Sequence, residues 1–520
     1  MTGLRFAPFG FAMLLLGACA APGAQGVAAD SPTPGEEGAP APGAHPTPPE
    51  APMPPLVFPE DPFRAEMPKG GPPRPLKTPE LQRFKLENGI SVFLVERHNL
   101  PIVSMSLVFD GGGTVDPKGK EGLASVCAGL MSQGTEKLDK IAFEEAMADV
   151  ASDVSSGASD DQHWVSFNSL SKNLEPTMGL WTDTLLRPGM RQDELDRNLK
   201  RRVAGLKQMK GDAAAVAGRL ANSVVYGPLH PVGRFATETS YGSIDLAACK
   251  KFVADYVRPQ GARLFAVGDI SKAELVREVE KRLGGWSGRA KRAPTLGRAR
   301  PRKGKVFFVD IPNAQQSVVT MMHIGPPRKA PDYHATSLMS AILGGGFSSR
   351  LNMNLREKHG YTYGARGGFD YTRQDSVFRA NASVRADATK ESIAEMLKEI
   401  RGLRQGAPTP EELSREKNGS ILALPSQFAT GGQTLGAFRM LVYYGLPLDY
   451  FDTYTTKVQG VSLNAVDKAA DKHLKPEDLQ ILVVGDRQQV LPKLDELAKE
   501  KVIPAVKPVE LDPDGNVVGG

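Results

Sequence analysis

Two short stretches, Leu264-Phe-Ala-Val-Gly-Asp269 and Ile481-Leu-Val-Val-Gly-Asp486, decide the fold of this 520-residue chain. Each is an apolar run that ends in Gly-Asp, the pattern of a buried strand followed by a turn. A Pro stands five positions before each run, and the two runs begin 217 positions apart. The sequence therefore predicts two homologous halves.

Other patterns repeat in the same order in the two halves. A pair of apolar strands opens each half: Ile90–Val95 with Ile102–Phe109, and Lys305–Val309 with Ser317–Met322. Long segments with apolar residues three and four apart, Glu194–Lys210 and Ala388–Leu403, predict helices. Strands grouped with helices, without strict βαβ alternation, predict an α+β fold. We expect an antiparallel or mixed sheet packed with several helices in each half.

Composition and sequence motifs divide the chain into six segments. They are a signal peptide with a lipobox (1–19), a disordered tether rich in Pro, Ala and Gly (20–78), an N-terminal domain (79–288), a basic linker (289–304), a C-terminal domain (305–505) and a tail (506–520). The length allows two to four globular domains.

The N-terminus has the features of an exported protein. Arg5 precedes a short apolar run, Phe11–Leu16, which is too short to span a bilayer as a mature helix. The following Gly-Ala-Cys19 resembles a bacterial lipobox, whose Cys becomes the lipidated first residue. We expect lipidation at Cys19 and, because Ala20 follows it, the outer membrane facing the periplasm. The alternatives are an ordinary secretory signal cut near Ala20 and the inner membrane.

The stretch from Arg289 to Lys305 holds eight Lys or Arg and no acid. One interpretation is contact with anionic lipid or another polyanion, and the other is a solvated interdomain linker. The net charge of the whole chain is only +5, so composition gives no case for nucleic acid.

Three stretches resemble the two-domain branch of the zinc-peptidase family that includes insulinase, pitrilysin and the mitochondrial processing peptidase. They are Gly111–Ala124 continuing to Gln133-Gly-Thr135, Leu343-Gly-Gly-Gly-Phe-Ser-Ser-Arg-Leu351 followed by Leu355-Arg-Glu-Lys-His-Gly-Tyr-Thr-Tyr363, and the two Val-Gly-Asp strand ends. They occur in the family's order over residues 80–505. The resemblance implies the family's clamshell chamber. It also implies that the Gly-rich segment at 344–346 lines this chamber and lets chains pass closely, rather than forming a phosphate loop.

Active members of that family carry His-x-x-Glu-His directly after Gly-Leu-Ala. The two His, four residues apart on one helix, bind zinc, and the Glu is the general base. Here Ser125, Ala128 and Gly129 stand at those three positions. The family's third ligand falls near Gly205 or Leu206, and no acid occurs between Asp196 and Asp212. The resemblance therefore implies a degenerate site with no metal or cofactor on this chain.

Neither cysteines nor histidines suggest a replacement site. Cys127 lies on the apolar stripe of the same helix, where it is a small core residue or, alternatively, a replacement ligand or reactive thiol. With only three cysteines, a disulfide-rich scaffold is excluded. No two of the eight His are within ten residues of each other, so no helical or hairpin His pair exists.

The second half keeps another family feature, Arg356 and Tyr363. Gly360 predicts a helix C-cap, which places Arg356 in the last helical turn and puts Tyr361 and Tyr363 on one face of the next strand. The resemblance implies that Arg356 and Tyr363 hold the substrate backbone and stabilise an oxyanion at a zinc site on another chain. The alternative is a structural Arg and a core Tyr.

Three hypotheses follow. The first is a non-catalytic, lipid-anchored subunit that binds unfolded peptides and completes the active site of a partner carrying His-x-x-Glu-His and zinc. The second is a stand-alone peptide-binding or scaffold protein of the envelope, as a monomer or homodimer. The third is an active peptidase with a rebuilt metal site, which loss of three ligands and the base disfavours.

Overall fold

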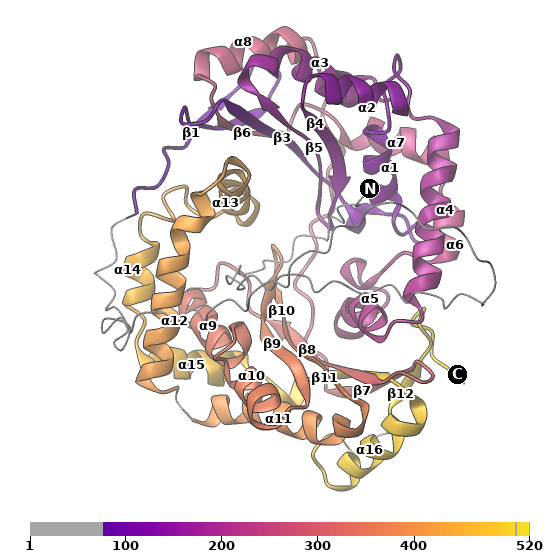
Figure 1. Ribbon diagram of the computed structural model, residues 1–520, viewed down its shortest axis with the longest axis vertical. Coiled ribbons are helices and arrows are strands. Elements are labelled where there is room, and N and C mark those ends of the chain that lie inside the picture. The colour runs from indigo at the N-terminus through magenta and orange to yellow at the C-terminus, as the bar shows by residue number, and fades with distance from the viewer. Residues whose placement is uncertain (1–75, 407, 505–506, 519–520) are drawn as a thin grey trace, which may run out of the picture. The chain divides into compact units, whose positions relative to one another are not determined.

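The computed structural model describes residues 76–406, 408–504 and 507–518, and Figure 1 shows the order of their helices and strands. Cys19, the signal segment and most of the expected tether lie outside the described residues. Among the helices that are described, none is both long and apolar enough to cross a lipid bilayer.

The first half is built on a six-stranded mixed sheet, here called sheet 1. In order across the sheet, its strands are β1 (Gln82–Lys85), β2 (Ser91–Glu96), β6 (Arg263–Gly268), β3 (Ile102–Asp110), β5 (Gln162–Leu170) and β4 (Asp153–Ala158). The β2–β6 pair is parallel and the other pairs are antiparallel. Strands β2, β6 and β3 are buried along nearly their whole length, as expected for strands covered on both faces.

The second half repeats this arrangement in sheet 2, which also has six strands. They are β12 (Val509–Leu511), β7 (Lys305–Asp310), β11 (Gln480–Gly485), β8 (Gln316–Gly325), β10 (Ser376–Arg385) and β9 (Thr362–Tyr371). The β7–β11 pair is parallel, as is β2–β6, and β12 adds a parallel edge strand. The predicted α+β fold with two homologous halves is confirmed.

The opening strands of each half do not pair with each other, contrary to expectation. The Gly-Asp strand lies between them in both sheets: β6 separates β2 from β3, and β11 separates β7 from β8. The connections 97–101 and 311–315 have five residues each, which is long enough to step over one strand at a spacing of about 4.8 Å. The strand that ends in Gly-Asp thus takes a central position in each sheet.

Helices cover one face of each sheet and complete its core. Sheet 1 packs against α1 (Leu123–Met131), α2 (Lys140–Asp149), α3 (Leu174–Leu186), α4 (Gln192–Met209), α6 (Glu238–Gly242), α7 (Leu246–Tyr256) and α8 (Lys272–Leu283). Sheet 2 packs against α9 (Tyr333–Ser340), α10 (Arg350–Asn352), α11 (Thr389–Gln405), α12 (Pro410–Ala423), α14 (Tyr454–Gln459), α15 (Leu463–His473) and α16 (Arg487–Lys499). The predicted helices 194–210 and 388–403 are α4 and α11.

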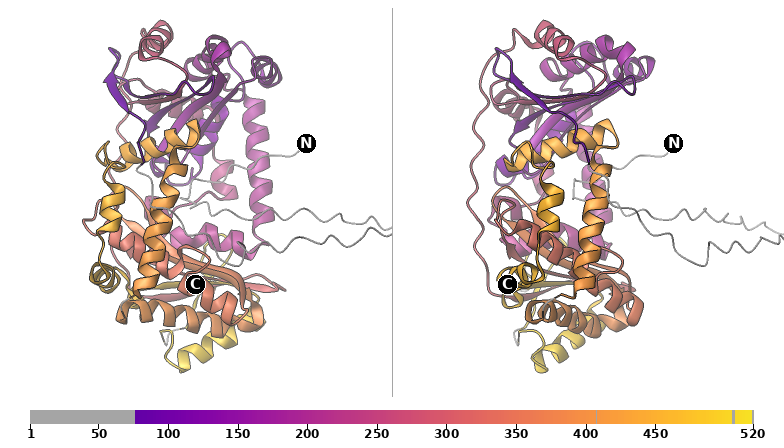
Figure 2. Two further views of the ribbon diagram at one scale, coloured as in Figure 1. Left: turned by 60° about the vertical axis from the view of Figure 1, so that its left-hand side comes forward. Right: turned by 90° about the vertical axis from the view of Figure 1, so that its left-hand side faces the viewer.

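Each half sends one helix to the sheet of the other half. Helix α5 (Ala213–Tyr226) of the first half packs Leu220 and Val224 on the apolar residues of β7, β8 and β11. Helix α13 (Gly431–Tyr444) of the second half packs Phe438 and Leu441 on β2, β3 and β6 (Figure 1). Both views in Figure 2 show orange helices of the second half reaching the indigo strands of the first. Two buried apolar clusters therefore hold the halves together.

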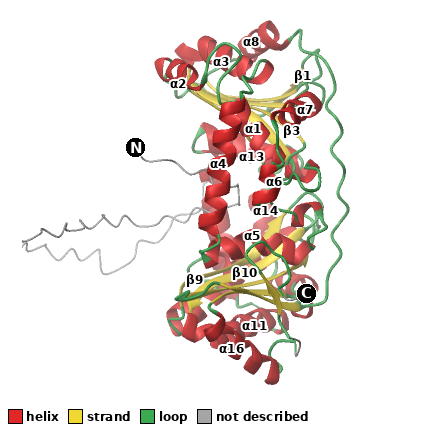
Figure 3. Cartoon of the chain, turned by 90° about the vertical axis from the view of Figure 1, so that its right-hand side faces the viewer, coloured by secondary structure: helices red, strands yellow, loops and turns green. Residues whose placement is uncertain are grey.

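The linker and the C-terminal tail also connect the halves. Residues 284–304 form a long extended loop without regular helix or strand, drawn in green in Figure 3. Part of the tail is ordered, because it carries β12. Beyond that strand, Asp514 forms ion pairs with Lys210 at 2.6 Å and Arg219 at 2.9 Å, both from the first half.

Candidate functional site

Helix α1 carries the three degenerate positions, and a buried carboxylate fixes its start. Asp116 accepts hydrogen bonds from the backbone N–H groups of Gly122 and Ala124, both at 2.8 Å. Gly122 has a φ of +96°, and a Cβ on it would stand 2.6 Å from the ring of Tyr241, so only glycine fits there. Burial raises the pKa of Asp116 to about 7, although both N–H groups favour the charged form.

A guanidinium lies where α1 faces α4. Arg202 of α4 donates a hydrogen bond to the carbonyl oxygen of Ser125 at 3.3 Å, and its Nη2 lies 3.9 Å from where a Cβ of Gly129 would be. Asn198 orients Arg202 by accepting from Nε at 2.6 Å. On the side of β4, the carbonyl oxygen of Ala128 accepts from Ser156 at 2.6 Å.

These residues do not fit a zinc ion. Ser125, Ala128 and Gly129 offer no imidazole, thiolate or carboxylate, and in the described part of the chain no group of three or more His, Cys, Asp or Glu could hold a metal. Gly205 and Leu206 both lie on α4, and Leu206 is buried in the core. The positive charge of Arg202 would also oppose a bound cation. We derive no metal-dependent step for this chain.

A disulfide joins α1 to α7, which sequence analysis did not foresee. The bond links Cys127 to Cys249, whose Cα atoms are 4.8 Å apart, and both side chains are fully buried. The predicted burial of Cys127 is correct, but the residue is neither a free core thiol nor a replacement ligand. A separation of 122 residues gave no signal for the pairing. The only signal in the sequence was the presence of two cysteines beyond Cys19 in a chain expected to be exported.

Two of the histidines are buried, one in the core of each half. His163 of β5 stacks on Phe109 with ring centroids 4.9 Å apart, and His323 of β8 stacks on Phe378 at the same separation. Burial lowers the pKa of both His163 and His323 to about 4, so both are neutral at pH 7. Both His–Phe pairs lie across corresponding strand pairs, β3–β5 and β8–β10, although the two His are on strands that do not correspond, and this placement indicates a packing role.

The Gly-rich segment permits a close approach of two backbone segments of this chain. Gly344 forms an isolated bridge with Gly367 of β9, and a Cβ on Gly344 would stand 2.1 Å from the backbone nitrogen of Gly367. Arg350 then anchors the segment through a bidentate ion pair with Glu412 of α12. Its Nε and Nη2 each donate to one carboxylate oxygen at 2.7 Å. Leu351 is fully buried. This part of the motif is therefore structural, and it positions the residues that follow.

Arg356 and Tyr363 lie at the surface on either side of a turn. Arg356 is in a π-helical turn (Met353–Lys358), and Gly360, two residues beyond it, has a φ of +64° as a C-terminal glycine requires. Its side chain is 43% exposed and lies 5.0 Å from the ring centroid of Phe347. Tyr363, on β9, is 89% exposed. Neither residue is a core side chain.

Tyr361 differs from the expectation that it shares a strand face with Tyr363. It precedes β9, and its ring stacks on His359 with centroids 4.9 Å apart. Its backbone N–H closes the turn by donating to the carbonyl oxygen of Leu355 at 2.8 Å. Tyr361 is thus held within the turn, whereas the Tyr363 side chain is free to contact another molecule.

A polar network between the halves also had no local signal in the sequence. Asp110 of β3 forms ion pairs with Arg263 at 2.7 Å and with Arg373, in the β9–β10 turn, at 2.9 Å. Burial opposes the charged carboxylate, but the two guanidinium groups outweigh it and lower the pKa of Asp110. Nearby, Tyr443 of α13 donates to Asp161 at 2.6 Å. The partners are more than 100 residues apart, so only the fold brings them together.

Fold and site together define a protein with the two-domain frame of a zinc peptidase but without its zinc ligands. Residues 91–223 match the family described as "Insulinase (Peptidase family M16)", and residues 243–420 match "Peptidase M16 inactive domain". The chain belongs to peptidase family M16, and Ser125, Ala128 and Gly129 stand where active members carry His-x-x-Glu-His.

Individual relatives agree with this assignment. A "Non-peptidase homolog YmxG" from Helicobacter pylori is 21% identical over 77% of this chain and 93% of its own length. Among solved structures, a "peptidase M16 inactive domain" from Pseudomonas fluorescens is 26% identical, with a TM-score of 0.73 over 78% of this chain and 98% of that one. A protease from Helicobacter pylori has the same fold, with 20% identity and a TM-score of 0.70 over 78% of this chain and 99% of that one.

Proposed function

We propose that this chain is the non-catalytic subunit of a zinc metallopeptidase complex in the bacterial envelope. The observation that carries the proposal is the exposure of Arg356 and Tyr363 on a chain whose own α1 site is filled by Arg202. A partner with His-x-x-Glu-His brings the zinc and the general base, and this chain completes the site and helps to enclose an unfolded peptide.

The chemistry of the two side chains suits that role. A guanidinium and a phenol donate strong hydrogen bonds to a peptide carbonyl, and both can follow the oxygen as it becomes negative. The anchored turn before it, held by Arg350 and Glu412, limits the motion of Arg356 and so preserves the alignment that such stabilisation needs.

The proposal includes export and anchoring through a lipidated Cys19 in the outer membrane. Support comes from the signal-like N-terminus and from the Cys127–Cys249 bond, because disulfides persist in the periplasm and are rare in the cytosol. A Cys19→Ser variant should move from the membrane fraction to the soluble fraction of the envelope. Retention of that variant in the membrane would contradict the anchor.

The test of the complex is co-purification from the native cells. The soluble Cys19→Ser chain is captured, its partners are identified by mass spectrometry, and zinc is measured in the eluate. We expect a co-eluting His-x-x-Glu-His protein and about one zinc ion per pair of chains. A metal-free chain with no such partner would overturn the trans-acting role and favour a stand-alone peptide-binding or scaffold protein.

A further inference from the structure

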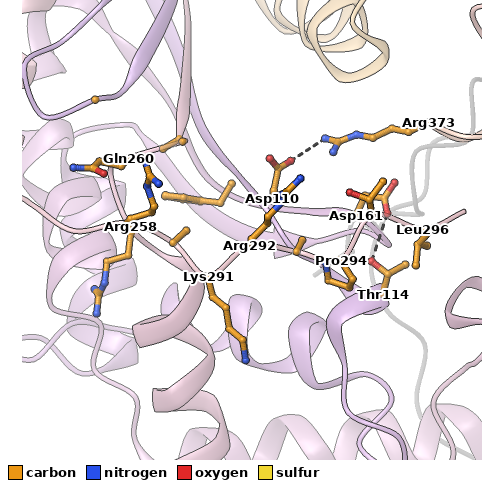
Figure 4. Close-up of a pocket in the computed structure, with 18 of the residues that line it drawn as sticks. Asp110, Thr114, Asp161, Arg258, Gln260, Lys291, Arg292, Pro294, Leu296 and Arg373 are labelled. Carbon is orange, nitrogen blue, oxygen red and sulfur yellow. Dashed lines mark hydrogen bonds and ion pairs between the residues drawn. The ribbon is translucent and has the colours of Figure 1, made fainter.

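A cavity of about 850 Å³ lies between the linker and the first half, and nothing in the proposed function uses it. Three separate parts of the chain line it: residues at the ends of strands in sheet 1, linker residues 289–296, and the β9–β10 turn at 373–374. Figure 4 shows the linker crossing the cavity, with Asp110, Thr114 and Asp161 behind it. A cavity of this size suits a ligand of several residues rather than a single ion.

The charges in this cavity are unbalanced. Two of its three acids already have partners, since Asp110 pairs with Arg263 and Arg373, and Asp161 accepts from Tyr443. Five lining cations form no ion pair with any described residue: Lys85, Arg258, Arg289, Lys291 and Arg292. Glu87, the third acid, is exposed. A concave site with this excess of positive charge concentrates anions.

The linker backbone is also available for pairing. Lys291 donates its N–H to Asp255, and Ala299 donates to Asp375, but between them residues 292–298 make no backbone hydrogen bond to the described chain. The segment is extended, so successive side chains alternate in direction. In Figure 4, Lys291 and Arg292 point to opposite sides of the linker, with Arg292 towards Asp110. An extended partner can therefore add main-chain hydrogen bonds alongside charge pairing.

The shape and lining argue against two other anionic partners. A bilayer surface cannot enter a concave site, and the expected tether of more than 50 residues does not hold the linker against the membrane. A nucleotide needs a ring on which its base can stack, but Phe109, the single aromatic residue in the lining, is 1% exposed.

We propose that this cavity binds an acidic peptide segment, with its carboxylates met by Arg289, Lys291 and Arg292 and its backbone paired to linker residues 292–298. The site belongs to the isolated chain. It goes beyond the proposed function and stands whether or not a zinc-bearing partner exists.

The experiment compares two linker variants that lose equal charge. The probe is a fluorescein-labelled (Glu-Ser)4 peptide, and its binding to the purified full chain is measured by fluorescence anisotropy. The cavity variant is Arg289→Ala/Lys291→Ala/Arg292→Ala. The control is Arg300→Ala/Lys303→Ala/Lys305→Ala, which removes two exposed cations of the same linker and the exposed first residue of β7, none of which lines the cavity.

We expect the cavity variant to bind at least about tenfold more weakly and the control to stay within about twofold of the unaltered chain, with binding weakened by added salt. Equal loss in both variants would reveal diffuse attraction and overturn the site. A neutral (Gln-Ser)4 peptide that binds equally well, or an acidic peptide that does not bind the unaltered chain, would also overturn it. Capture of phosphatidylglycerol vesicles through the three cavity cations, without peptide binding, would replace the peptide with a lipid surface. Unchanged thermal melting of both variants verifies that they fold.

Discussion

The two halves share one fold but differ in how they present the segments that carry the family's site positions. In the first half, α1 is surrounded: Arg202 lies against Ser125 and Gly129, and a disulfide at Cys127 fixes the helix to α7. In the second half, the segment after the Gly-rich turn leaves Arg356 and Tyr363 exposed. The same architecture thus contains one closed site and one open site.

This difference supports the proposal that the second half presents Arg356 and Tyr363 to another molecule. Interactions within the chain now hold α1: the carboxylate at Asp116, the guanidinium at Arg202 and a covalent bond. Among the residues that the structure describes, nothing comparable covers Tyr363, although the π-helical turn beside it is firmly anchored. A rigid support that presents exposed donors is the arrangement expected of a binding surface.

The largest expected effect is the loss of the disulfide in the first half. Cys249→Ala should lower the free energy of unfolding by about 3–5 kcal/mol, since the bond closes a loop of more than 100 residues and lies in the core. Urea unfolding followed by circular dichroism measures it. The Cys127→Ala/Cys249→Ala double variant should lower the free energy of unfolding by about as much as the single variant, because either change breaks the bond. A cost below about 1 kcal/mol would show that the bond does not secure α1.

The second effect tests the open site on the second half. Arg356→Ala should lower kcat/KM of the assembled peptidase about 100-fold, and Tyr363→Phe about tenfold, because each removes a donor to the developing oxyanion. The control is Lys358→Ala, an exposed cation in the same turn, which should change activity less than about twofold. Steady-state kinetics on a fluorogenic peptide measures all three. Equal rates for the Arg356 and Lys358 variants would assign Arg356 a role outside the reaction.

The sequence was sufficient for the architecture of two homologous halves, but not for the strand order or for the contacts around α1. Repeated apolar runs depend on local order along the chain, so the two halves could be anticipated, whereas the roles of Arg356 and Tyr363 rest on the family resemblance and stay a prediction. Strand order could not, because β6 enters between β2 and β3 from more than 150 residues away. Arg202 and the Cys127–Cys249 bond are likewise contacts between segments far apart in the sequence, and no local pattern encodes them.

A third, smaller effect tests whether Arg202 keeps the first site closed. Ser125→His/Gly129→His restores two imidazoles four residues apart on one helix face. In that background we expect Arg202→Ala to raise zinc affinity at least about tenfold, because a positive charge beside the metal is removed. Competition with a chromogenic chelator measures it. Arg201→Ala removes the same charge from an exposed neighbour on α4 and should change little. Equal gains from the Arg201 and Arg202 variants would rule out a specific effect at this position.

The smallest effect concerns the ion pairs of Asp110 with Arg263 and Arg373, which connect the two halves. Asp110→Asn should lower the free energy of unfolding by only about 1 kcal/mol. The carboxylate is 41% exposed, so water screens its pairing with Arg263 and Arg373. The pKa of Asp110 is lowered in the folded chain, so its contribution is complete above pH 4 and declines as the pH falls through the lowered value. Urea unfolding should therefore show a difference in the free energy of unfolding between the unaltered and variant chains at pH 7. This difference should be smaller at pH 3. A difference in the free energy of unfolding that widens in acid would mean that the charged carboxylate destabilises the fold.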